Sequence, residues 1–464
     1  MVKSMAQLPS SFRDPSGFMY LQDQILFRQV NPIYREHYDQ LISSGLYDEL
    51  VRDGLLIPHT EVDLSQAASD DAYKVLRPDY VPFISHPHEW SFSQFKDSAL
   101  VTLEIQKRAL NRGMSLKDAS AYNIALVGGK PKLIDTLSFE RYSEGVPWVA
   151  YRQFCQHFLA PIALMHFSDV RLSQLFVTNI DGIPLDLASK LLPFRSNFNL
   201  AIKLHIHLHA KTQRQYADKT IKQRLTHQKM PLRSLLGLID NLESAIRKWK
   251  WDSKQTNWSD YYGNDSYTEP AFRDKQRLVE QWIIQVPPTT VWDCGANTGE
   301  FSRIASKKGI LTVSMDFDPG TVDQNYQQAL KEKDANIFPI VVDLTVPTPS
   351  IGWANQERKS LLSRSPADLV LALALIHHLA ITNNVPLGQV AQLFAGMAKR
   401  LVIEFVPKGD PKVQTLLANR DDIFPDYTPE GFEAAFEKYF LIEQKSSIQD
   451  SQRILYLMRN KEIL

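Results

Sequence analysis

The sequence predicts an α/β protein whose C-terminal part, residues 271–464, forms a mostly parallel sheet. Short apolar runs alternate there with segments of helical spacing, which is the pattern of consecutive βα units. Most of these runs end at or near a polar residue, and the first ends in a turn rich in small residues. The chain has 464 residues, more than one hydrophobic core usually serves, so we expect further domains before this one.

The first strand of this part, Thr290 to Trp292, runs into the sequence Asp-Cys-Gly-Ala-Asn-Thr-Gly at 293–299. A helical segment, Phe301 to Lys308, follows it. Glycine has no Cβ, so a strand-to-helix turn of this composition can press its backbone against a ligand. Asn297 stands among the small residues, and asparagine tolerates the left-handed conformation that such a turn needs.

The next two strands each lead to an acidic residue. Ile310 to Met315 is followed by Asp316, and Ile337 to Val342 by Asp343. A carboxylate at the tip of the second strand is where nucleotide-binding α/β folds hold a ribose. Because ligands bind beyond the carboxyl ends of parallel strands, we expect both acids to face one cleft.

The remaining strands complete the sheet. Ala367 to Ala374 is the fourth and leads to His377 and His378, and Leu401 to Phe405 is the fifth and contains Glu404. The segments 440–444 and 453–458 have the pattern of a final antiparallel hairpin.

These motifs together resemble class I S-adenosylmethionine-dependent methyltransferases, in particular motif I and the acidic motif after it. The resemblance implies a Rossmann-like, seven-stranded sheet with S-adenosylmethionine as cofactor. It implies that the glycine loop lies against the methionine part, that Asp316 bonds the ribose and that Asp343 faces the adenine amino group. The cofactor-binding residues predicted in this way are Asp293, Gly295, Asn297, Gly299, Asp316, Phe317, Asp343, Leu344 and Ala374.

Methyl transfer needs a positioned acceptor, which must lose a proton if it is a hydroxyl. His377 or His378 is a candidate general base because histidine titrates near neutral pH, and loop packing is the alternative role for both. Glu404 is a candidate acceptor ligand. The polar-aromatic runs 352–358 and 404–410 are expected to be loops at the cofactor end, where acceptor selection usually occurs. No metal site is predicted.

The N-terminal part, residues 1–200, is expected to be an accessory α+β domain. A helical segment, 98–112, precedes Asp118, which stands five residues before Asn123. A Gly-Gly turn then separates two short strands, the second ending in Asp135. This order resembles the catalytic loop and metal-binding Asp of protein kinase-like folds, which implies a vestigial site at Asp118, Asn123 and Asp135. The sequence departs from that pattern because no His-Arg precedes Asp118 and Thr-Leu follows Asp135. No convincing glycine-rich phosphate loop is present, and Lys74 is only a weak candidate for the strand lysine.

Residues 201–270 are expected to form a basic helical connector and a flap. The leucines and isoleucines at 232–246 recur at helical spacing, and lysine and arginine outnumber acids through 203–250. The whole chain resembles bacterial two-part methyltransferases associated with nodulation and surface polysaccharides, which suggests a glycan or small-molecule acceptor with a hydroxyl or amine. An RNA methyltransferase that uses the basic connector is one alternative. A kinase-like binding scaffold fused to a methyltransferase is the other.

Composition limits the surroundings in which the protein works. Lysine plus arginine and aspartate plus glutamate both number 52, so net charge gives no argument for nucleic acid or an anionic membrane as partner. The two cysteines, Cys155 and Cys294, fit a reducing cytoplasm better than a disulfide framework. We find neither a signal peptide nor an apolar run near the length of about 18 residues that spans a membrane, so we expect a cytoplasmic protein without a membrane partner.

Overall fold

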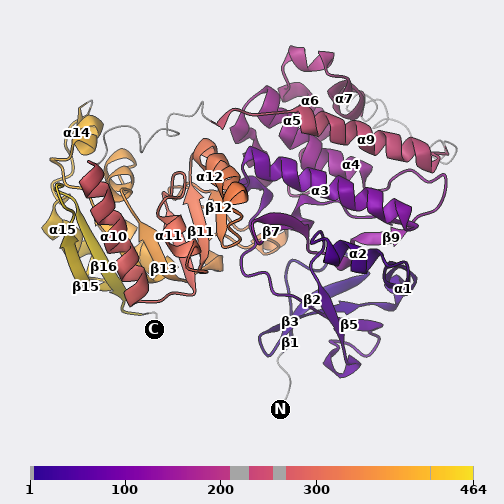
Figure 1. Cartoon of the computed structure of the whole chain (residues 1–464), viewed down its shortest axis with the longest axis horizontal. Coiled ribbons are helices and arrows are strands. Elements are labelled where there is room, and N and C mark those ends of the chain that lie inside the picture. The colour runs from indigo at the N-terminus through magenta and orange to yellow at the C-terminus, as the bar shows by residue number, and fades with distance from the viewer. Residues whose placement is uncertain (1–4, 210–228, 254–267, 419, 463–464) are drawn as a thin grey trace. The chain divides into compact units, whose positions relative to one another are not determined.

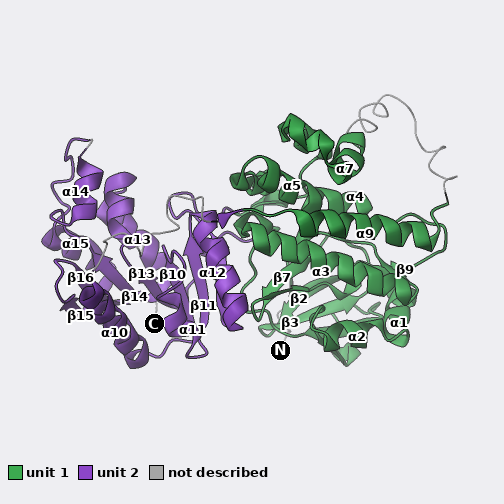
Figure 2. Cartoon of the chain, turned by 45° about the horizontal axis from the view of Figure 1, so that its top comes forward, with its two compact units in different colours: residues 1–251, 350–358 green, residues 252–349, 359–464 purple. Residues whose placement is uncertain are grey.

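The structure is a computed structural model that describes residues 5–209, 229–253, 268–418 and 420–462 (Figure 1). It divides into two compact units (Figure 2). Unit 1 consists of Met1–Trp251 and Ser350–Arg358, and unit 2 of Asp252–Pro349 and Lys359–Leu464. The mixed α/β class is as predicted. The division at 1–200, 201–270 and 271–464 stays a prediction, because the stretches 210–228 and 254–267 of the expected connector and flap lie outside the described residues.

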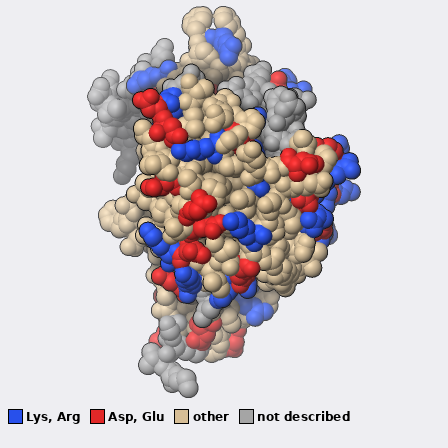
Figure 3. Space-filling model, turned by 90° about the vertical axis from the view of Figure 1, so that its left-hand side faces the viewer, with Lys and Arg blue, Asp and Glu red and all other residues tan. Residues whose placement is uncertain are grey.

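Charges of both signs are mixed on the surface. On the face drawn in Figure 3, the lysine and arginine side chains are interspersed with aspartate and glutamate. The described residues therefore show no continuous basic track on that face. Among these residues there is also no helix with the length and apolarity required to cross a bilayer.

Unit 1 begins with a five-stranded antiparallel sheet. Its strands, in spatial order, are β1 (Met5–Gln7), β2 (Gly17–Gln22), β3 (Ile25–Val30), β5 (Lys74–Pro78) and β4 (His59–Val62). The helices α1 (Arg35–Ser43) and α2 (Leu46–Arg52) come between β3 and β4 in the chain. Successive residues of a strand face opposite sides, and accordingly Val75 and Leu76 belong to different apolar clusters.

The rest of unit 1 is mainly helical. A long helix, α3 (Phe92–Asn111), precedes two small antiparallel pairs, β6 (Met114–Leu116) with β9 (Phe139–Arg141) and β7 (Ile124–Val127) with β8 (Lys130–Leu133). The α-helices that follow are α4 (Tyr151–Phe154), α5 (Ala160–Phe167), α6 (Leu185–Leu191), α7 (Leu200–Ile202) and α9 (Leu232–Lys248). Among them lie the π-helical turns η6 (Cys155–Leu159) and η9 (Lys203–His207) and the 3-10 segments η7 (Val170–Val177) and η8 (Phe194–Phe198).

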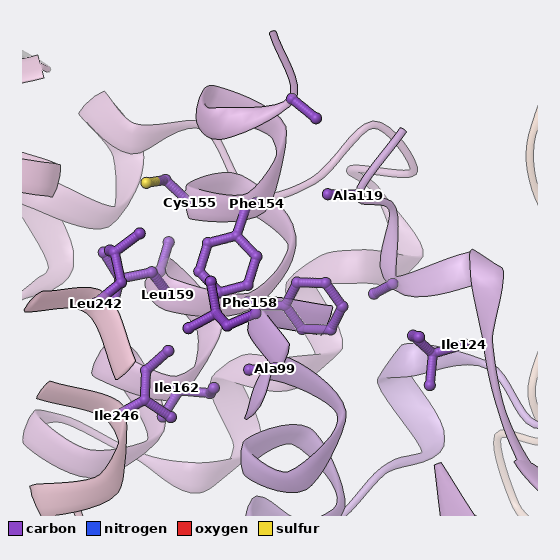
Figure 4. Packing of buried hydrophobic residues seen from close by; sticks show 14 of the residues in the cluster. Ala99, Ala119, Ile124, Phe154, Cys155, Phe158, Leu159, Ile162, Leu242 and Ile246 are labelled. Carbon is purple, nitrogen blue, oxygen red and sulfur yellow. The ribbon is translucent and has the colours of Figure 1, made fainter. Parts of the chain in front are cut away.

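The core of unit 1 lies among these helices. Phe154 and Phe158 occupy its centre, with Leu242 and Ile246 of α9 beside them (Figure 4). The α9 side chains that pack there come from the apolar face that the helical spacing of 232–246 predicts. The burial of this apolar face explains why the basic sequence around 232–250 folds as a helix.

Unit 2 contains a seven-stranded sheet. Its spatial order is β12 (Ile337–Val341), β11 (Leu311–Asp316), β10 (Thr290–Cys294), β13 (Ala367–Ala372), β14 (Ala398–Phe405), β16 (Ile454–Asn460) and β15 (Phe440–Ser447). The first five strands are parallel, and the last two are antiparallel. Its α-helices are α10 (Glu269–Gln285), α11 (Ser302–Ser306), α12 (Pro319–Glu332), α13 (Leu387–Met397), α14 (Pro411–Leu417) and α15 (Pro429–Phe436).

The order of the parallel strands fixes where a ligand can bind. From β10 the chain moves outward through β11 to β12 and then returns to the other side of β10 at β13. The loops after β10 and β13 therefore diverge, and a crevice opens at the carboxyl ends of these two strands. Helix α10 packs Val279 and Trp282 against one face of the sheet, in a cluster with Val291 and Leu369.

Part of the connection from β12 to β13 belongs to unit 1. Ser350–Arg358 is part of unit 1, where Ile351 is 6% exposed and packs in the large core cluster. Ile351 and Arg358 form a two-way backbone bridge, and Glu357 pairs with Arg13 at 2.8 Å. The run 352–358, which the sequence analysis placed at the cofactor end as an acceptor loop, is thus built into unit 1.

This placement predicts the outcome of one core truncation. Changing Ile351 to Ala should lower the free energy of unfolding of unit 1 by about 2–4 kcal/mol, because buried methylene groups are lost and a cavity remains. Hydrogen exchange followed by mass spectrometry should report faster exchange in α3 and α9. The control is Val346→Ala, in the same connection but 75% exposed, which should change nothing. Faster exchange confined to β10 and β13 would contradict the assignment of Ile351 to unit 1.

Candidate cofactor site

A cavity of about 280 Å³ lies in unit 2 at the carboxyl ends of the parallel strands. Most residues that the sequence analysis assigned to a cofactor line it together, namely Asp293, Gly295, Asn297, Asp316, Phe317, Asp343, Leu344 and Ala374. His378 lines it as well. Gly299, His377 and Glu404 do not. Residues separated by some 80 positions in the chain thus converge on one space.

The glycine loop after β10 follows its predicted conformation. Gly295, Asn297 and Gly299 all have positive φ, at 75°, 50° and 84°. The prediction that Asn297 adopts the left-handed conformation is confirmed. A Cβ on Gly299 would lie only 2.5–2.7 Å from the side chains of Asn325 and Arg303, so this glycine serves the packing of the loop rather than the cavity.

The carboxylate of Asp316, at the end of β11, is held in a fixed position. One oxygen accepts a hydrogen bond from the backbone of Asn297 at 2.8 Å and the other from the backbone of Asp318 at 2.9 Å. The side chain is 7% exposed, and burial raises its pKa to about 6. The Thr321 side chain is a third donor to this carboxylate, so one of its about four acceptor sites is left for a hydroxyl in the cavity.

Asp293 is the second buried acid of the site. It accepts a hydrogen bond from the Ser302 hydroxyl at 2.6 Å, and burial raises its pKa to about 6. Asp343 differs, because it is exposed and accepts bonds from the backbone and hydroxyl of Thr345 at 2.8 Å and 2.6 Å. The cavity therefore combines two buried carboxylates with one that contacts solvent.

Glu404 belongs to a buried network of charges beside the cavity. It is fully buried, its Oε2 lies 2.6 Å from Lys275 Nζ, and Arg453 approaches its Oε1 at 3.4 Å. Arg453 also donates two hydrogen bonds to Asp410, at 2.7 Å and 3.2 Å. Oε2 accepts a further bond at 2.8 Å from the backbone of Ala374, whose φ is +50°. The carboxylate that was expected to hold an acceptor is instead occupied by these donors.

The two histidines after β13 have different surroundings. His377 is fully buried, neither ring nitrogen has a hydrogen-bond partner, and burial holds its pKa well below the ordinary value. It does not line the cavity, so its candidacy as general base is not supported. His378 lines the cavity with its pKa lowered to about 4 by burial, and it is a neutral imidazole at neutral pH.

Several lining residues were missed by the sequence analysis, among them Lys275, Phe301, Leu379, Thr382 and Asn383. Lys275 carried a usable signal, because it stands four residues after Ala271 in the apolar stripe that continues with Leu278 and Trp282. A lysine in the buried stripe of a helix requires a counter-ion. Phe301, Leu379, Thr382 and Asn383 belong to segments of ordinary composition.

In unit 1, the three residues of the kinase-like pattern lie close together. Asn123 donates to the Ser138 hydroxyl at 3.2 Å, and that hydroxyl donates to Asp135 at 2.9 Å. Asp118 accepts a bond from Gln153 at 2.8 Å, and its pKa is raised by burial and by the charge of Asp135.

The Asp135 carboxylate already has a cationic partner. The guanidinium of Arg28 on β3 lies 2.8 Å from it, and both side chains are largely buried. Lys74, the weak candidate for the strand lysine, pairs with Glu61 at 2.6 Å instead. Among the described residues there is no group of three or more metal-ligating side chains.

Removing the Glu404 charge should test how much the fold depends on the network. Glu404→Gln leaves the Lys275 ammonium buried without a full counter-charge, and should lower the free energy of unfolding by about 3–5 kcal/mol. The control is Glu443→Gln on β15, which breaks a half-exposed pair with Arg459 and should cost less than about 1 kcal/mol. Urea denaturation measures both variants. An equal decrease in the free energy of unfolding of both variants would show that the buried network contributes no more to stability than the half-exposed pair.

Comparisons with known proteins place the chain in a family. No family model matches it. Several solved structures match part of the chain. The bifunctional kinase-methyltransferase WbdD is 16% identical with a TM-score of 0.30, and the match covers 43% of this chain and 42% of that chain. Magnesium protoporphyrin IX methyltransferase (ChlM) from Synechocystis PCC 6803 gives 18% identity, TM-score 0.32 and coverages of 44% and 92%. N-methyltransferase NodS from Bradyrhizobium japonicum WM9 gives 12% identity, TM-score 0.31 and coverages of 41% and 97%.

One curated relative matches along the whole length. Nodulation protein NoeA from Rhizobium meliloti strain 1021 is 35% identical over 464 residues, which cover 98% of this chain and 96% of the relative. The chain belongs to the NoeA family of nodulation proteins.

Proposed function

We propose that unit 2 transfers a methyl group from S-adenosylmethionine to an acceptor molecule. The observation that carries this proposal is the convergence of the glycine loop, Asp316 and Asp343 on one cavity at the carboxyl ends of β10, β11 and β12. The strand order places that cavity where α/β sheets bind nucleotides. The name of the relative, a nodulation protein, is the basis for proposing a part in nodulation.

The residues that line the cavity suit this cofactor. The remaining acceptor site of Asp316 suits a ribose hydroxyl, and the glycine loop lets the backbone approach the methionine part closely. Phe317 and Leu344 offer apolar surface for the adenine, with Asp343 at its edge. The cofactor supplies an activated methyl group on a positively charged sulfonium, and the buried carboxylates Asp293 and Asp316 favour a cation.

For the acceptor we propose a hydroxyl or amine of a glycan or another small molecule. His378 is the residue placed to accept a proton from a hydroxyl, because it lines the cavity and is neutral at neutral pH. Its lowered pKa makes it a weak base. An amine acceptor needs no strong base, since the neutral nitrogen already carries a lone pair. Thr382 and Asn383 add further polar groups to the lining of the cavity.

RNA remains the alternative acceptor. It would require a basic track that leads from Lys203 through Lys250 to the cavity, and the part of that connector at 210–228 lies outside the described residues. The interspersed charges of Figure 3 lend this alternative no support on the face shown. We place the reaction in the cytoplasm, where the buried thiols of Cys155 and Cys294 stay reduced.

For unit 1 we propose a kinase-like scaffold without phosphotransfer. Phosphoryl transfer needs metal ions to neutralise the phosphates. The Arg28 guanidinium competes with a metal ion for the Asp135 carboxylate, which makes that acid a poor ligand.

Addition of ATP and magnesium should therefore leave the thermal unfolding of the protein unchanged. The variant Arg28→Met removes the cationic partner of Asp135, and its thermal unfolding with ATP and magnesium is compared with that of the wild type. A shift of several degrees in the wild-type protein that disappears in Asp135→Asn would refute the scaffold proposal, because it would reveal a working nucleotide and metal site.

Loss of the Asp316 carboxylate tests the cofactor site. Asp316→Ala should weaken binding of S-adenosylhomocysteine by about 1.5–3 kcal/mol, the loss expected for charge-assisted hydrogen bonds. Wild-type affinity should also fall as the pH drops below about 6, since the protonated acid accepts hydrogen bonds less well. Isothermal calorimetry provides both readings. Glu300→Ala is the control, an exposed acid next to the loop that does not line the cavity.

Unchanged affinity in Asp316→Ala would exclude the proposed cofactor orientation.

A separate experiment identifies the acceptor class: transfer of a labelled methyl group is measured to glycan, RNA and protein fractions. Label that appears in a fraction with wild-type protein and not with Asp316→Ala identifies it.

A further inference from the structure

Several apolar side chains are exposed in the segment of unit 1 that contains α6, η8 and α7. Figure 1 labels α6 and α7. Phe194 and Phe198 are 79% and 83% exposed, and their rings contact each other edge to face with centroids 5.9 Å apart. We define the apolar patch as these two residues with Leu191, Leu200 and Leu204, which are all exposed as well. Single exposed apolar side chains are ordinary, but five within 14 positions are a feature that needs a partner.

The helical part of the segment is apolar on two sides. Ile202 and Ile206 are fully buried in the core of unit 1, as the inward face of a surface helix should be. Leu200 and Leu204 stand on the outward side, where a solvated helix carries polar residues. The outward face is therefore built for a surrounding other than bulk water.

Partly buried hydrogen bonds of His207 join the elements that carry the apolar patch. The ring of His207 is hydrogen-bonded to the Ser189 hydroxyl at 2.7 Å and to the Ser196 hydroxyl at 3.2 Å. Ser196 is fully buried between the two exposed phenylalanines in sequence. These bonds tie η8 to α6 and η9, so the exposed rings project from a braced turn.

The charged residues within the segment that carries the apolar patch are basic from position 187 onward. No acidic residue occurs between Asp186 and Asp218 in the sequence. Lys190, Arg195 and Lys203 lie within the described part of this interval, and all three are exposed. Aromatic and leucine side chains that alternate in sequence with basic residues match the boundary between head groups and acyl chains of an anionic bilayer.

We propose that the apolar patch docks unit 1 on the surface of an anionic lipid bilayer. Phe194 and Phe198 enter the head-group region, while Lys190, Arg195 and Lys203 pair with lipid phosphates. The proposal concerns a peripheral contact and is independent of the methyl-transfer chemistry proposed for unit 2. It differs from the expectation of a protein without a membrane partner, which was based on net charge and on the length of apolar runs.

Vesicle sedimentation with the full chain tests the proposal. The protein should sediment with vesicles of phosphatidylcholine and phosphatidylglycerol in equal parts, and much less with phosphatidylcholine alone. The double variant Phe194→Ser, Phe198→Ser should bind at least about tenfold more weakly, since each phenylalanine contributes its buried apolar area. Lys190→Glu with Lys203→Glu should weaken binding as well, and added salt should do the same.

The matched control is Ile33→Ser with Tyr80→Ser, two residues of unit 1 that are 71% and 77% exposed outside the apolar patch. It should bind vesicles like the wild type. Thermal unfolding should be the same for all variants, because the altered side chains are exposed. Absence of vesicle binding, or equal binding by the phenylalanine variant, would overturn the proposal. So would self-association in light scattering that the phenylalanine variant abolishes, because the apolar patch would then be an interface between copies.

Discussion

One buried carboxylate, that of Glu404, joins the elements beside the cavity of unit 2. Three elements that are remote in sequence supply its donors: Lys275 from α10, Arg453 before β16 and the backbone of Ala374 after β13. Ala374 has a left-handed backbone that costs an ordinary residue about 1–3 kcal/mol, and the bond to Glu404 holds it. With Asp410, the network contains two acids and two bases, so its charges balance. Neutrality makes such a cluster tolerable inside a protein, and it fixes the loop that borders the cavity.

Local patterns sufficed for features that lie within a few residues of one another. The strands that end in acids, and the left-handed turn at Asn297, follow from side-chain period and backbone sterics. The roles of His377 and His378 could not follow, because adjacent residues on a helical turn point about 100° apart. The orientation of the helical turn after β13 determines which of the two imidazole rings lines the cavity. Glu404 was misread for a related reason, since its partner Lys275 lies 129 residues earlier.

A counter-ion that is remote in sequence also limits what the kinase-like pattern of unit 1 can bind. The order Asp118, Asn123, Asp135 is visible in the sequence, while Arg28 on β3 carries no local mark as the partner of Asp135. The run 352–358 is a similar case. Its polar-aromatic composition suggested a loop at the cofactor end, yet it belongs to the segment 350–358 of unit 1, whose one buried apolar residue, Ile351, packs in the core of that unit. Zero net charge likewise hid the acid-free interval after Asp186, because a sum over the chain says nothing of its distribution.

The two acids of the cavity show that this site is not optimised for stability. Burial raises the pKa of Asp293 and Asp316 to about 6, above the value near 4 of an unfolded chain. The folded protein therefore binds more protons than the unfolded chain between these values, and their contribution to stability grows as pH falls from about 6 to about 4. At neutral pH both are ionised, which costs on the order of 2–3 kcal/mol each. A cation that enters the cavity offsets this cost in the folded state alone. The same desolvation that weakens the free protein thus strengthens its preference for a positively charged ligand.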